Sequence, residues 1–242
     1  YILASETCAL DIIGADFVRD VSPGEVVVVD ETGISTHFPF SAPPKRFCIF
    51  EHIYFSRPDS VVEGRSVYDV RKDIGRQLAT ENPVEADLII PVPDSHLGVK
   101  LKHNANRALI SGKRVILVDD SIVRGTTSTK IVQMVREAGA TEVHMRIASP
   151  PTTHSCFYGV DTPSRAKLLA AQYDLDEMCA FIGADSLNFI SLDGLYIAMG
   201  EEGRNAKQPQ YCDACFTGDY PIELVDNDTG ADKELTLLAE RY

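Results

Sequence analysis

The sequence has no long hydrophobic run: no apolar stretch approaches the roughly 20 residues that a membrane-spanning helix needs. It is also short of positive charge, with 23 Lys and Arg against 36 Asp and Glu and a net charge of -13. An acidic chain of this kind is unsuited to general binding of nucleic acid or of a membrane surface. Its first residues lack a basic segment followed by an apolar core, so we expect no secretory signal peptide.

Internal repeats and low-complexity tracts are absent as well. The chain of 242 residues, with 44% hydrophobic and 24% charged residues, has the composition of an ordinary globular protein. This length is enough to bury a sizeable core, as one large domain or as one domain with part of another.

The most informative stretch is KRVILVDDSIVRGTTSTKIVQMVREAG, residues 113–139. Residues 115–118 form an apolar run rich in β-branched side chains, which is typical of a strand buried on both faces of a parallel sheet. Two carboxylates at 119–120 follow directly. Apolar side chains between 131 and 138 then recur on one face of a helix, which Gly139 ends. The stretch therefore predicts a strand, an acidic pair, a loop of small residues and a helix.

Each part of this stretch has a chemical use. A loop that leads into a helix N-terminus presents free backbone N–H groups and a positive dipole end, which suits a phosphate. Gly125 allows close approach of the backbone, and residues 126–128 add hydroxyl donors. Asp119 and Asp120 can accept hydrogen bonds from sugar hydroxyls or hold a divalent cation. The pattern predicts a site for a ribose 5-phosphate; the alternative is a capped turn with a solvated acidic pair.

The other segments predict further elements. Residues 25–36 read as a strand, a turn and a second strand. Ser66 caps a helix with Asp69 three residues on, and its buried face consists of Val67, Val70, Ile74 and Leu78. Further predictions are a strand at 47–56, a buried strand at 86–95, a strand at 142–149, two short helices within 164–183 with Asp174 capping the second, a strand and helix at 186–200, a polar loop at 201–210 and a short final helix in the acidic tail.

VILVDDSIVRGTTS resembles the signature for 5-phosphoribosyl 1-pyrophosphate (PRPP) in type I phosphoribosyltransferases. Within that group the chain is similar to the glutamine phosphoribosylpyrophosphate amidotransferases (amidophosphoribosyltransferases), in the branch with an iron–sulfur cluster. The resemblance rests on the stretches ALDIIGADFVRDVSPGE, CIFEHIYFSRPDS, PVPDS, EAGATEVHMRIASPP, CFYGVDTP, FIGADSL and YCDACFTGDYP. It implies an α/β type I phosphoribosyltransferase fold, a mainly parallel sheet flanked by helices, preceded by short β segments from a glutaminase domain.

The resemblance also implies a domain organisation. Residues 1–40 correspond to the C-terminal remnant of the glutaminase (N-terminal nucleophile) domain, 41–225 to the phosphoribosyltransferase domain and 226–242 to an acidic tail. The nucleophile of that glutaminase is an N-terminal cysteine, which this sequence does not supply, so we expect the chain to be part of a longer protein. Between Ser95 and His96 we expect missing residues, because the family carries there a long segment with a loop that closes over PRPP.

The implied activity is transfer of ammonia to C1 of PRPP, giving 5-phosphoribosylamine and pyrophosphate, the committed entry to purine synthesis. Glutamine supplies the ammonia in the full-length enzyme. The implied partners are PRPP, ammonia or glutamine, purine nucleotides as feedback inhibitors and further copies of the chain in a homo-oligomer, in the cytoplasm. Two alternatives stay open. One is a nucleobase phosphoribosyltransferase, although the cysteine pattern and the glutaminase remnant argue against it. The other is a non-catalytic regulator that binds PRPP.

By the same resemblance, Asp119 and Asp120 bind the ribose hydroxyls, residues 125–127 hold the 5-phosphate, and Asp94 with Ser95 contacts the pyrophosphate. Lys102 falls where the family directs a lysine toward pyrophosphate, and Arg124 is either structural or a pyrophosphate neighbour. No side chain is an obvious general base. The full PRPP-binding set is Asp94, Ser95, Lys102, Asp119, Asp120, Ser121, Ile122, Val123, Arg124, Gly125, Thr126, Thr127 and Ser128, and the Mg²⁺ set is Ser95, Asp119 and Asp120.

Six cysteines are present, among them a CxxC at Cys212 and Cys215. By itself a CxxC is shared by zinc sites, redox pairs and iron–sulfur clusters. The resemblance implies that Cys48 and Cys156 complete a [4Fe–4S] site with this pair, with zinc as the competing occupant because four thiolates suit both. The four sulfurs should then converge in a structural site. The other two cysteines, Cys8 and Cys179, fall outside this pattern and read as free thiols.

Overall fold

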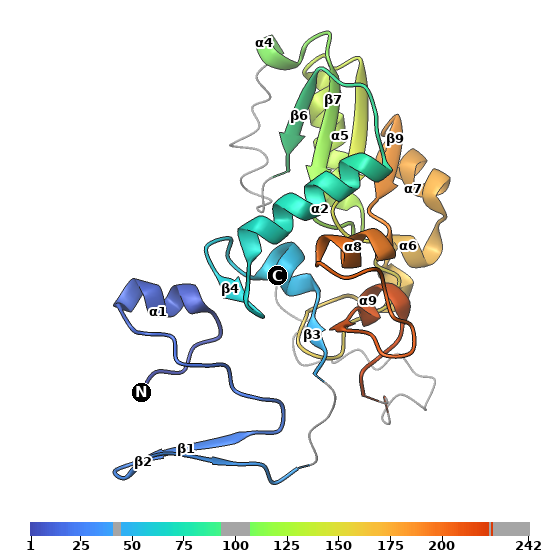
Figure 1. Ribbon diagram of the computed structural model, residues 1–242. Coiled ribbons are helices and arrows are strands. Elements are labelled where there is room, and N and C mark those ends of the chain that lie inside the picture. Colours follow the sequence, from blue (N-terminus) through green and yellow to red (C-terminus); the bar gives the residue numbers. More distant parts are fainter. Residues whose placement is uncertain (41–44, 93–106, 223, 225–242) are drawn as a thin grey trace, which may run out of the picture. The chain divides into compact units, whose positions relative to one another are not determined.

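The computed structural model describes residues 1–40, 45–92, 107–222 and 224 (Figure 1). The chain divides into two compact units, the first formed by Tyr1–Asp73 with Arg204–Cys212 and the second by Ile74–Gly203 with the chain from Asp213. Their boundary falls inside helix α2, Val67–Glu81. The predicted domain boundaries at 40 and 225 stay predictions. None of the helices within the described ranges is both long and apolar enough to cross a membrane.

The second unit contains a four-stranded parallel sheet (Figure 1). Its strands, in spatial order, are β6 (Leu88–Pro91), β7 (Arg114–Asp119), β8 (Glu142–Ile147) and β9 (Ser186–Phe189). Since all four run in the same direction, their carboxyl ends meet at one edge, where open α/β sheets bind ligands. The predicted α/β fold with a parallel sheet is confirmed.

Helices α5 (Thr126–Glu137) and α7 (Leu175–Ile182) contribute to one core with the sheet. Val115, Met145 and Ile147 of the strands are at most 1% exposed there, as is Ile131 of α5. The predicted buried strand before the acidic pair and the predicted helix face behind it are therefore confirmed. Among the described residues this unit also contains the end of α2 and the helical segments α4 (Arg107–Ile110), η2 (Arg165–Lys167), α6 (Leu169–Gln172), α8 (Leu192–Ala198) and α9 (Ala214–Thr217).

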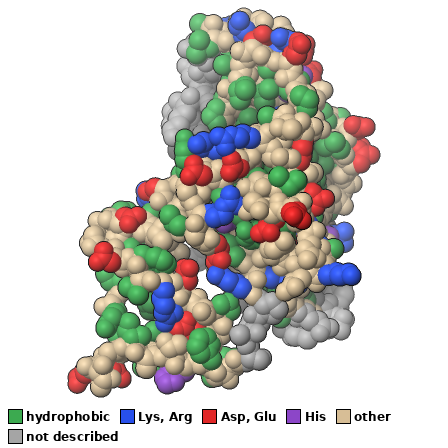
Figure 2. Space-filling view, in the orientation of Figure 1, with side chains coloured by type: hydrophobic (Ala, Val, Ile, Leu, Met, Phe, Trp, Pro, Cys, Tyr) green, Lys and Arg blue, Asp and Glu red, His purple; other side chains and the backbone are tan. Residues whose placement is uncertain are grey.

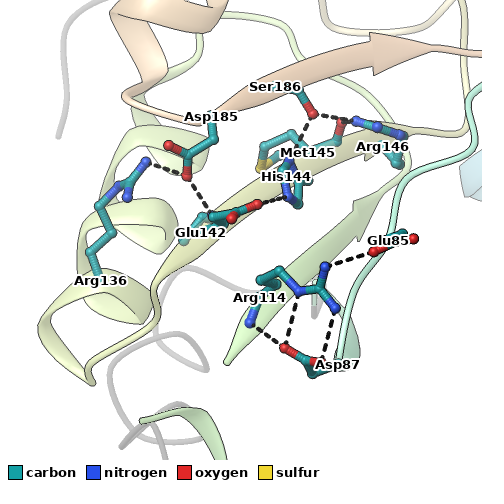
Figure 3. Close-up of polar contacts among 11 residues, drawn as sticks. Glu85, Asp87, Arg114, Arg136, Glu142, His144, Met145, Arg146, Asp185 and Ser186 are labelled. Atoms are coloured by element: carbon teal, nitrogen blue, oxygen red, sulfur yellow. Dashed lines mark hydrogen bonds and ion pairs between the residues drawn. The ribbon is translucent and has the colours of Figure 1, made fainter. Parts of the chain in front are cut away.

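Ion pairs connect residues at the amino ends of the strands (Figure 3). The Arg114 guanidinium at the start of β7 donates to the carboxylates of Glu85 at 3.0 Å and Asp87 at 3.3 Å. Arg136 of α5 pairs with Asp185, just before β9, at 2.8 Å. These contacts fix the strands at the end opposite the predicted phosphate site.

Successive side chains of a strand point to opposite faces of the sheet. One face of β8 packs into the hydrophobic core, and the other face carries polar side chains. His144 and Arg146 lie there, each only 6% exposed. The imidazole of His144 hydrogen-bonds Ser186 at 2.9 Å, and Arg146 donates to the same hydroxyl at 3.0 Å (Figure 3). Arg146 also donates to the Asn82 carbonyl at 3.1 Å. Since Asn82 follows α2, these bonds attach the end of that helix to the sheet.

The first unit consists of short elements. They are α1 (Thr7–Ile13), β1 (Val26–Asp30), β2 (Gly33–His37), β3 (Phe47–Cys48), η1 (Glu51–Phe55), β4 (Val61–Val62), β5 (Arg65–Ser66) and β10 (Tyr211–Cys212). Strands β1 and β2 form the predicted hairpin, antiparallel with Asp30 opposite Gly33. Large hydrophobic side chains such as Val18, at 86% exposed, lie on the surface of this N-terminal part (Figure 2).

The prediction of a strand over 47–56 was wrong. Only Phe47 and Cys48 form a strand, and a π-helix follows at Glu51–Phe55. The buried residues are Ile49, His52, Ile53 and Ser56, which is helical spacing, and the Arg71 side chain donates to the carbonyls of residues 52, 54 and 56. A distant side chain therefore outweighs the strand propensity of this aromatic segment.

The strand predicted over 86–95 is shorter and less buried than expected. Strand β6 is the outer strand of the described sheet and covers only Leu88–Pro91, and Ile89 is 65% exposed. A helix at Val67–Glu81 begins where predicted: Ser66 Oγ accepts the Asp69 N–H at 3.3 Å. The second helix within 164–183 begins with the predicted cap, Asp174. The helix predicted for the tail lies outside the described residues.

Candidate functional site

The acidic pair lies at the carboxyl edge of the parallel sheet. Asp119 is the last residue of β7, and its carbonyl accepts the Ala148 N–H from the segment after β8 at 2.9 Å. Its carboxylate accepts the Asp120 N–H at 3.0 Å, and the Asp120 carboxylate accepts the Ser121 hydroxyl at 2.6 Å. Both acidic side chains are half-buried. Local bonds thus hold two carboxylates in place where the sheet ends.

The loop after the acidic pair is anchored to the core. Ile122 is 3% exposed and packs into the hydrophobic core, and the Val123 carbonyl accepts the Leu169 N–H at 2.8 Å. Gly125 has φ +74°, and a Cβ added there would lie 2.8 Å from Leu169 Cδ2 and 3.1 Å from the Phe181 ring. Both the dihedral angle and the close packing therefore require glycine at this position.

Helix α5 begins directly behind this glycine, and no side chain of the described residues caps it. The N–H groups of a helix's first turn have no intrahelical acceptors, and the dipole adds positive potential there, so this end suits a phosphate. Thr126 is exposed and Thr127 half-buried, whereas Ser128 is 3% exposed. Arg124 is exposed. The structure thus brings together the predicted residues from Asp119 to Ser128.

Three predicted site residues, Asp94, Ser95 and Lys102, lie outside the described residues. Their contacts with pyrophosphate therefore stay predictions. Asp119 and Asp120 offer the hard carboxylate oxygens that Mg²⁺ prefers, whereas Ser95, the third predicted contributor, is among the residues not described.

Two of the four predicted cluster cysteines pair in the first unit. Strand β3 pairs with β10 in parallel, with Cys48 opposite Cys212, and the Ile49 N–H donates to the Cys212 carbonyl at 3.1 Å. Burial raises the pKa of the Cys48 thiol to about 11, and the nearby Cys212 adds to the shift. Residues 164 positions apart in sequence are thus neighbours on adjacent strands.

The other two cysteines lie near one tyrosine of the second unit. Tyr220 donates to the Ser155 carbonyl at 2.7 Å. Burial, with smaller contributions from Cys156 and Cys215, raises the pKa of the Tyr220 phenol to about 12. The Cys215 carbonyl accepts the N–H groups of Thr153 and His154, so both cysteines belong to segments that contact one another. The backbone N–H of Tyr158 also donates to Cys156 Sγ at 3.4 Å.

All six cysteines are free thiols. No three His, Cys, Asp or Glu side chains form a metal-binding group within the described part of the chain. The two cysteine pairs belong to different units, and a four-cysteine site stays a prediction. Sequence reasoning missed Tyr196, Asp213 and Tyr220 around these cysteines; only their position inside or near the CxxC stretch could have indicated them.

Comparisons with known proteins give a consistent set of relatives, although no family model matches the chain. The chain is 50% identical to an amidophosphoribosyltransferase of Rhizobium etli over 98% of its length and 57% of the relative's. It is 41% identical to the amidophosphoribosyltransferase of Bacillus subtilis, covering 93% of this chain and 55% of that one. The chain therefore spans about half the length of the curated relatives it matches.

Solved structures agree with these relatives. The glutamine PRPP amidotransferase from Bacillus subtilis, in complex with ADP and GMP, superposes with a TM-score of 0.81 at 39% identity, covering 92% of this chain and 57% of that one. A structure described as the allosteric regulatory enzyme of purine biosynthesis gives a TM-score of 0.82 at 39% identity over 92% and 56% of the two chains. The fold is thus that of the type I phosphoribosyltransferases.

The alignment with the Rhizobium etli relative has 283 positions, more than the 242 residues of this chain. The relative thus carries residues with no counterpart here. The prediction that a loop is missing between Ser95 and His96 concerns a stretch outside the described residues and stays a prediction.

Proposed function

Because this chain belongs to the amidophosphoribosyltransferase family, we propose that it carries the phosphoribosyl-transfer part of that activity. Ammonia attacks C1 of PRPP, the bond from C1 to the pyrophosphate oxygen breaks, and the nitrogen loses one proton to give 5-phosphoribosylamine. The observation that supports this most directly is the turn from β7 to α5, in which an acidic pair precedes an uncapped helix N-terminus.

Each half of this turn has a role in the proposed reaction. The N–H groups of α5's first turn, with the hydroxyls of Thr126 and Thr127, bind the 5-phosphate. The carboxylates of Asp119 and Asp120 accept hydrogen bonds from the ribose hydroxyls, which are charge-assisted and so strong. A sugar held at both ends presents C1 in a fixed orientation, and positioning of this kind lowers the barrier without a general base.

Mg²⁺ fits the donor set of this edge, and Ser95, Asp119 and Asp120 would hold it. When bound, it neutralises the charge of the departing pyrophosphate. Asp94, Ser95 and Lys102 would bind the same group. The chain's own contribution at this end is thus to orient the leaving group and to supply one cationic side chain.

We also propose a [4Fe–4S] cluster on Cys48, Cys156, Cys212 and Cys215, with zinc as the competing occupant. The support is the donor chemistry, since four thiolates suit such a cluster. Cys48 and Cys212 are partners on adjacent strands, and the Cys215 carbonyl accepts the N–H groups of Thr153 and His154, which shortly precede Cys156. Because Cys212 and Cys215 are three residues apart, the chain itself joins the two pairs. A metal centre with ligands from three segments would stabilise the fold, because the free energy of metal binding contributes to the free energy of folding.

The remaining partners follow from the same family. Purine nucleotides would act as feedback inhibitors; the Bacillus subtilis structure is a complex with ADP and GMP. Glutamine would supply ammonia in a longer protein, within a cytoplasmic homo-oligomer of the purine pathway. These assignments concern the activity of full-length relatives, of whose length this chain spans about half.

An assay of pyrophosphate release from PRPP tests the proposal. We expect release when ammonium is added and none without it. Release that requires a nucleobase would support a nucleobase phosphoribosyltransferase instead, and PRPP binding with no release under any condition would support a regulator.

A further inference from the structure

Leu169, the first residue of α6, contacts the loop of residues 123–125 in two ways. Its backbone N–H donates to the Val123 carbonyl at 2.8 Å. Its side chain is 3% exposed and packs against Gly125, where an added Cβ would lie 2.8 Å from Leu169 Cδ2. A single residue of another helix thus holds the loop through both its backbone and its side chain.

An aromatic ring completes this contact. The Phe181 ring of α7 lies 3.1 Å from the same added Cβ of Gly125. Tyr173, between α6 and α7, stacks on Phe181 with ring centroids 5.9 Å apart and an interplanar angle of 24°. Leu169, Tyr173 and Phe181 together form what we call the wall of loop 123–125, and all three belong to the second unit, as the loop does.

Helix α5 is held in place at both of its ends. At its start, the Gly125 carbonyl accepts the Thr129 N–H at 2.9 Å and the Thr129 hydroxyl at 3.0 Å. At its end, Arg136 donates to the carbonyl of Gly183, the C-cap of α7, at 2.9 Å and to Asp185 at 2.8 Å. Because α7 also carries Phe181, the same helix that supports the loop fixes the far end of α5.

The wall restricts a residue whose backbone is otherwise permissive. Glycine adopts positive and negative φ about equally readily, whereas hydrogen bonds from N–H groups weaken steeply when their angles change. The packing of Leu169 holds Gly125 at φ +74°. Without this packing only a fraction of the molecules would have the loop in the binding conformation, and the apparent affinity for a phosphate would fall by that fraction.

We propose that Leu169 is a positioning residue for the 5-phosphate of the sugar, which holds loop 123–125 and the first turn of α5 in the conformation that binds this group. Leu169 acts through Val123 and Gly125 rather than through contact with the phosphate. The inference rests on the proposed function, because it concerns how that site binds its substrate.

The proposal predicts a specific kinetic effect. The 5-phosphate is remote from C1, so it stays bound in the same way while the bond at C1 breaks. A loosened loop therefore weakens the binding of the substrate and of the transition state equally, which raises KM and leaves kcat unchanged. In Leu169→Ala we expect KM for PRPP to rise about tenfold, with kcat close to that of the wild type.

A binding measurement tests the same effect without turnover. Ribose 5-phosphate carries the 5-phosphate and lacks the pyrophosphate, and isothermal titration calorimetry gives its affinity for the chain. We expect Leu169→Ala to bind it about tenfold more weakly than the wild type. Leu168→Ala is the matched control, because Leu168 is also fully buried but supplies none of the three atoms nearest to an added Cβ at Gly125. It should lower thermal stability and leave the affinity and KM unchanged.

Each outcome separates the inference from the proposed function. A wild-type chain that does not bind ribose 5-phosphate would overturn the proposed site and this inference with it. Binding that Leu169→Ala leaves unchanged, or that Leu168→Ala weakens as much, would overturn the inference alone. If circular dichroism shows that Leu169→Ala is unfolded, Phe181→Leu decides, because Phe181 is 46% exposed and its replacement spares the core. Weaker binding by Phe181→Leu would support the wall, and unchanged binding would contradict it.

Discussion

At the scale of single residues, Asp119 and Asp120 should carry much of the recognition of the substrate's ribose. Replacing either by Asn keeps its shape and removes the charge that strengthens its hydrogen bonds. We expect kcat/KM for PRPP to fall by the equivalent of about 1–3 kcal/mol for each variant. Steady-state kinetics at low PRPP measures this loss, with Asp161→Asn as an exposed control. Turnover close to that of the wild type in both variants would remove the basis for the site.

Gly125 gives a second residue-scale prediction, about stability. Gly125→Ala introduces a side chain at φ +74° and places its Cβ 2.8 Å from Leu169. We expect the free energy of unfolding to fall by about 2 kcal/mol or more, from backbone strain and overpacking together. Gly112→Ala is a matched control, because Gly112 also has φ +74° but no atom of a described residue lies within 4 Å of the added Cβ. Urea unfolding should show the larger loss at Gly125; equal losses would mean that Leu169 adjusts freely.

At the scale of elements, the π-helix η1 contains a histidine that should make stability depend on pH. His52 is fully buried, and neither ring nitrogen has a hydrogen-bond partner among the described residues. Burial, together with the charges of Arg65 and Arg71, lowers the pKa of His52 to about 4. An unfolded histidine titrates at about 6.5. Between these two values the unfolded chain binds the extra proton, so stability falls as the pH drops through this window.

His52→Leu should remove this part of the pH dependence. We expect the wild type to lose more stability than the variant between pH 6.5 and pH 4, as measured by urea unfolding followed by circular dichroism. Replacing the exposed His37 of the same unit is the control for the loss of a histidine. Parallel curves for the wild type and His52→Leu would show that His52 is protonated in the folded protein.

The elements that could be predicted from the sequence are those whose signal is local. Helix α2 has the predicted cap at Ser66 and the predicted apolar spacing, and α7 has the predicted cap at Asp174. Strand β7 and helix α5 also follow from their periodicity. The π-helix could not be predicted, because Arg71 fixes it from another element, and neither could the exposure of β6, which depends on its place in the sheet.

In the candidate site, too, only the features with a local sequence signal could be predicted. The stretch from Asp119 to Ser128 is continuous in sequence, so its spacing predicted both the carboxylates and the helix N-terminus. The packing of Leu169 against Gly125 and the bond from Tyr196 to Asp213 join segments far apart in the chain. Such contacts leave no spacing pattern and appear only in the folded structure.

At the scale of the whole molecule, the central claim is that this chain transfers ammonia to C1 of PRPP. The most direct test supplies isotopically labelled ammonium with PRPP and Mg²⁺ and follows the label by nuclear magnetic resonance. We predict that the label appears bonded to C1 in an amount equal to the pyrophosphate released, and that glutamine cannot replace ammonium for this 242-residue chain. Pyrophosphate released without label at C1, or label incorporated only through a nucleobase, would contradict the account.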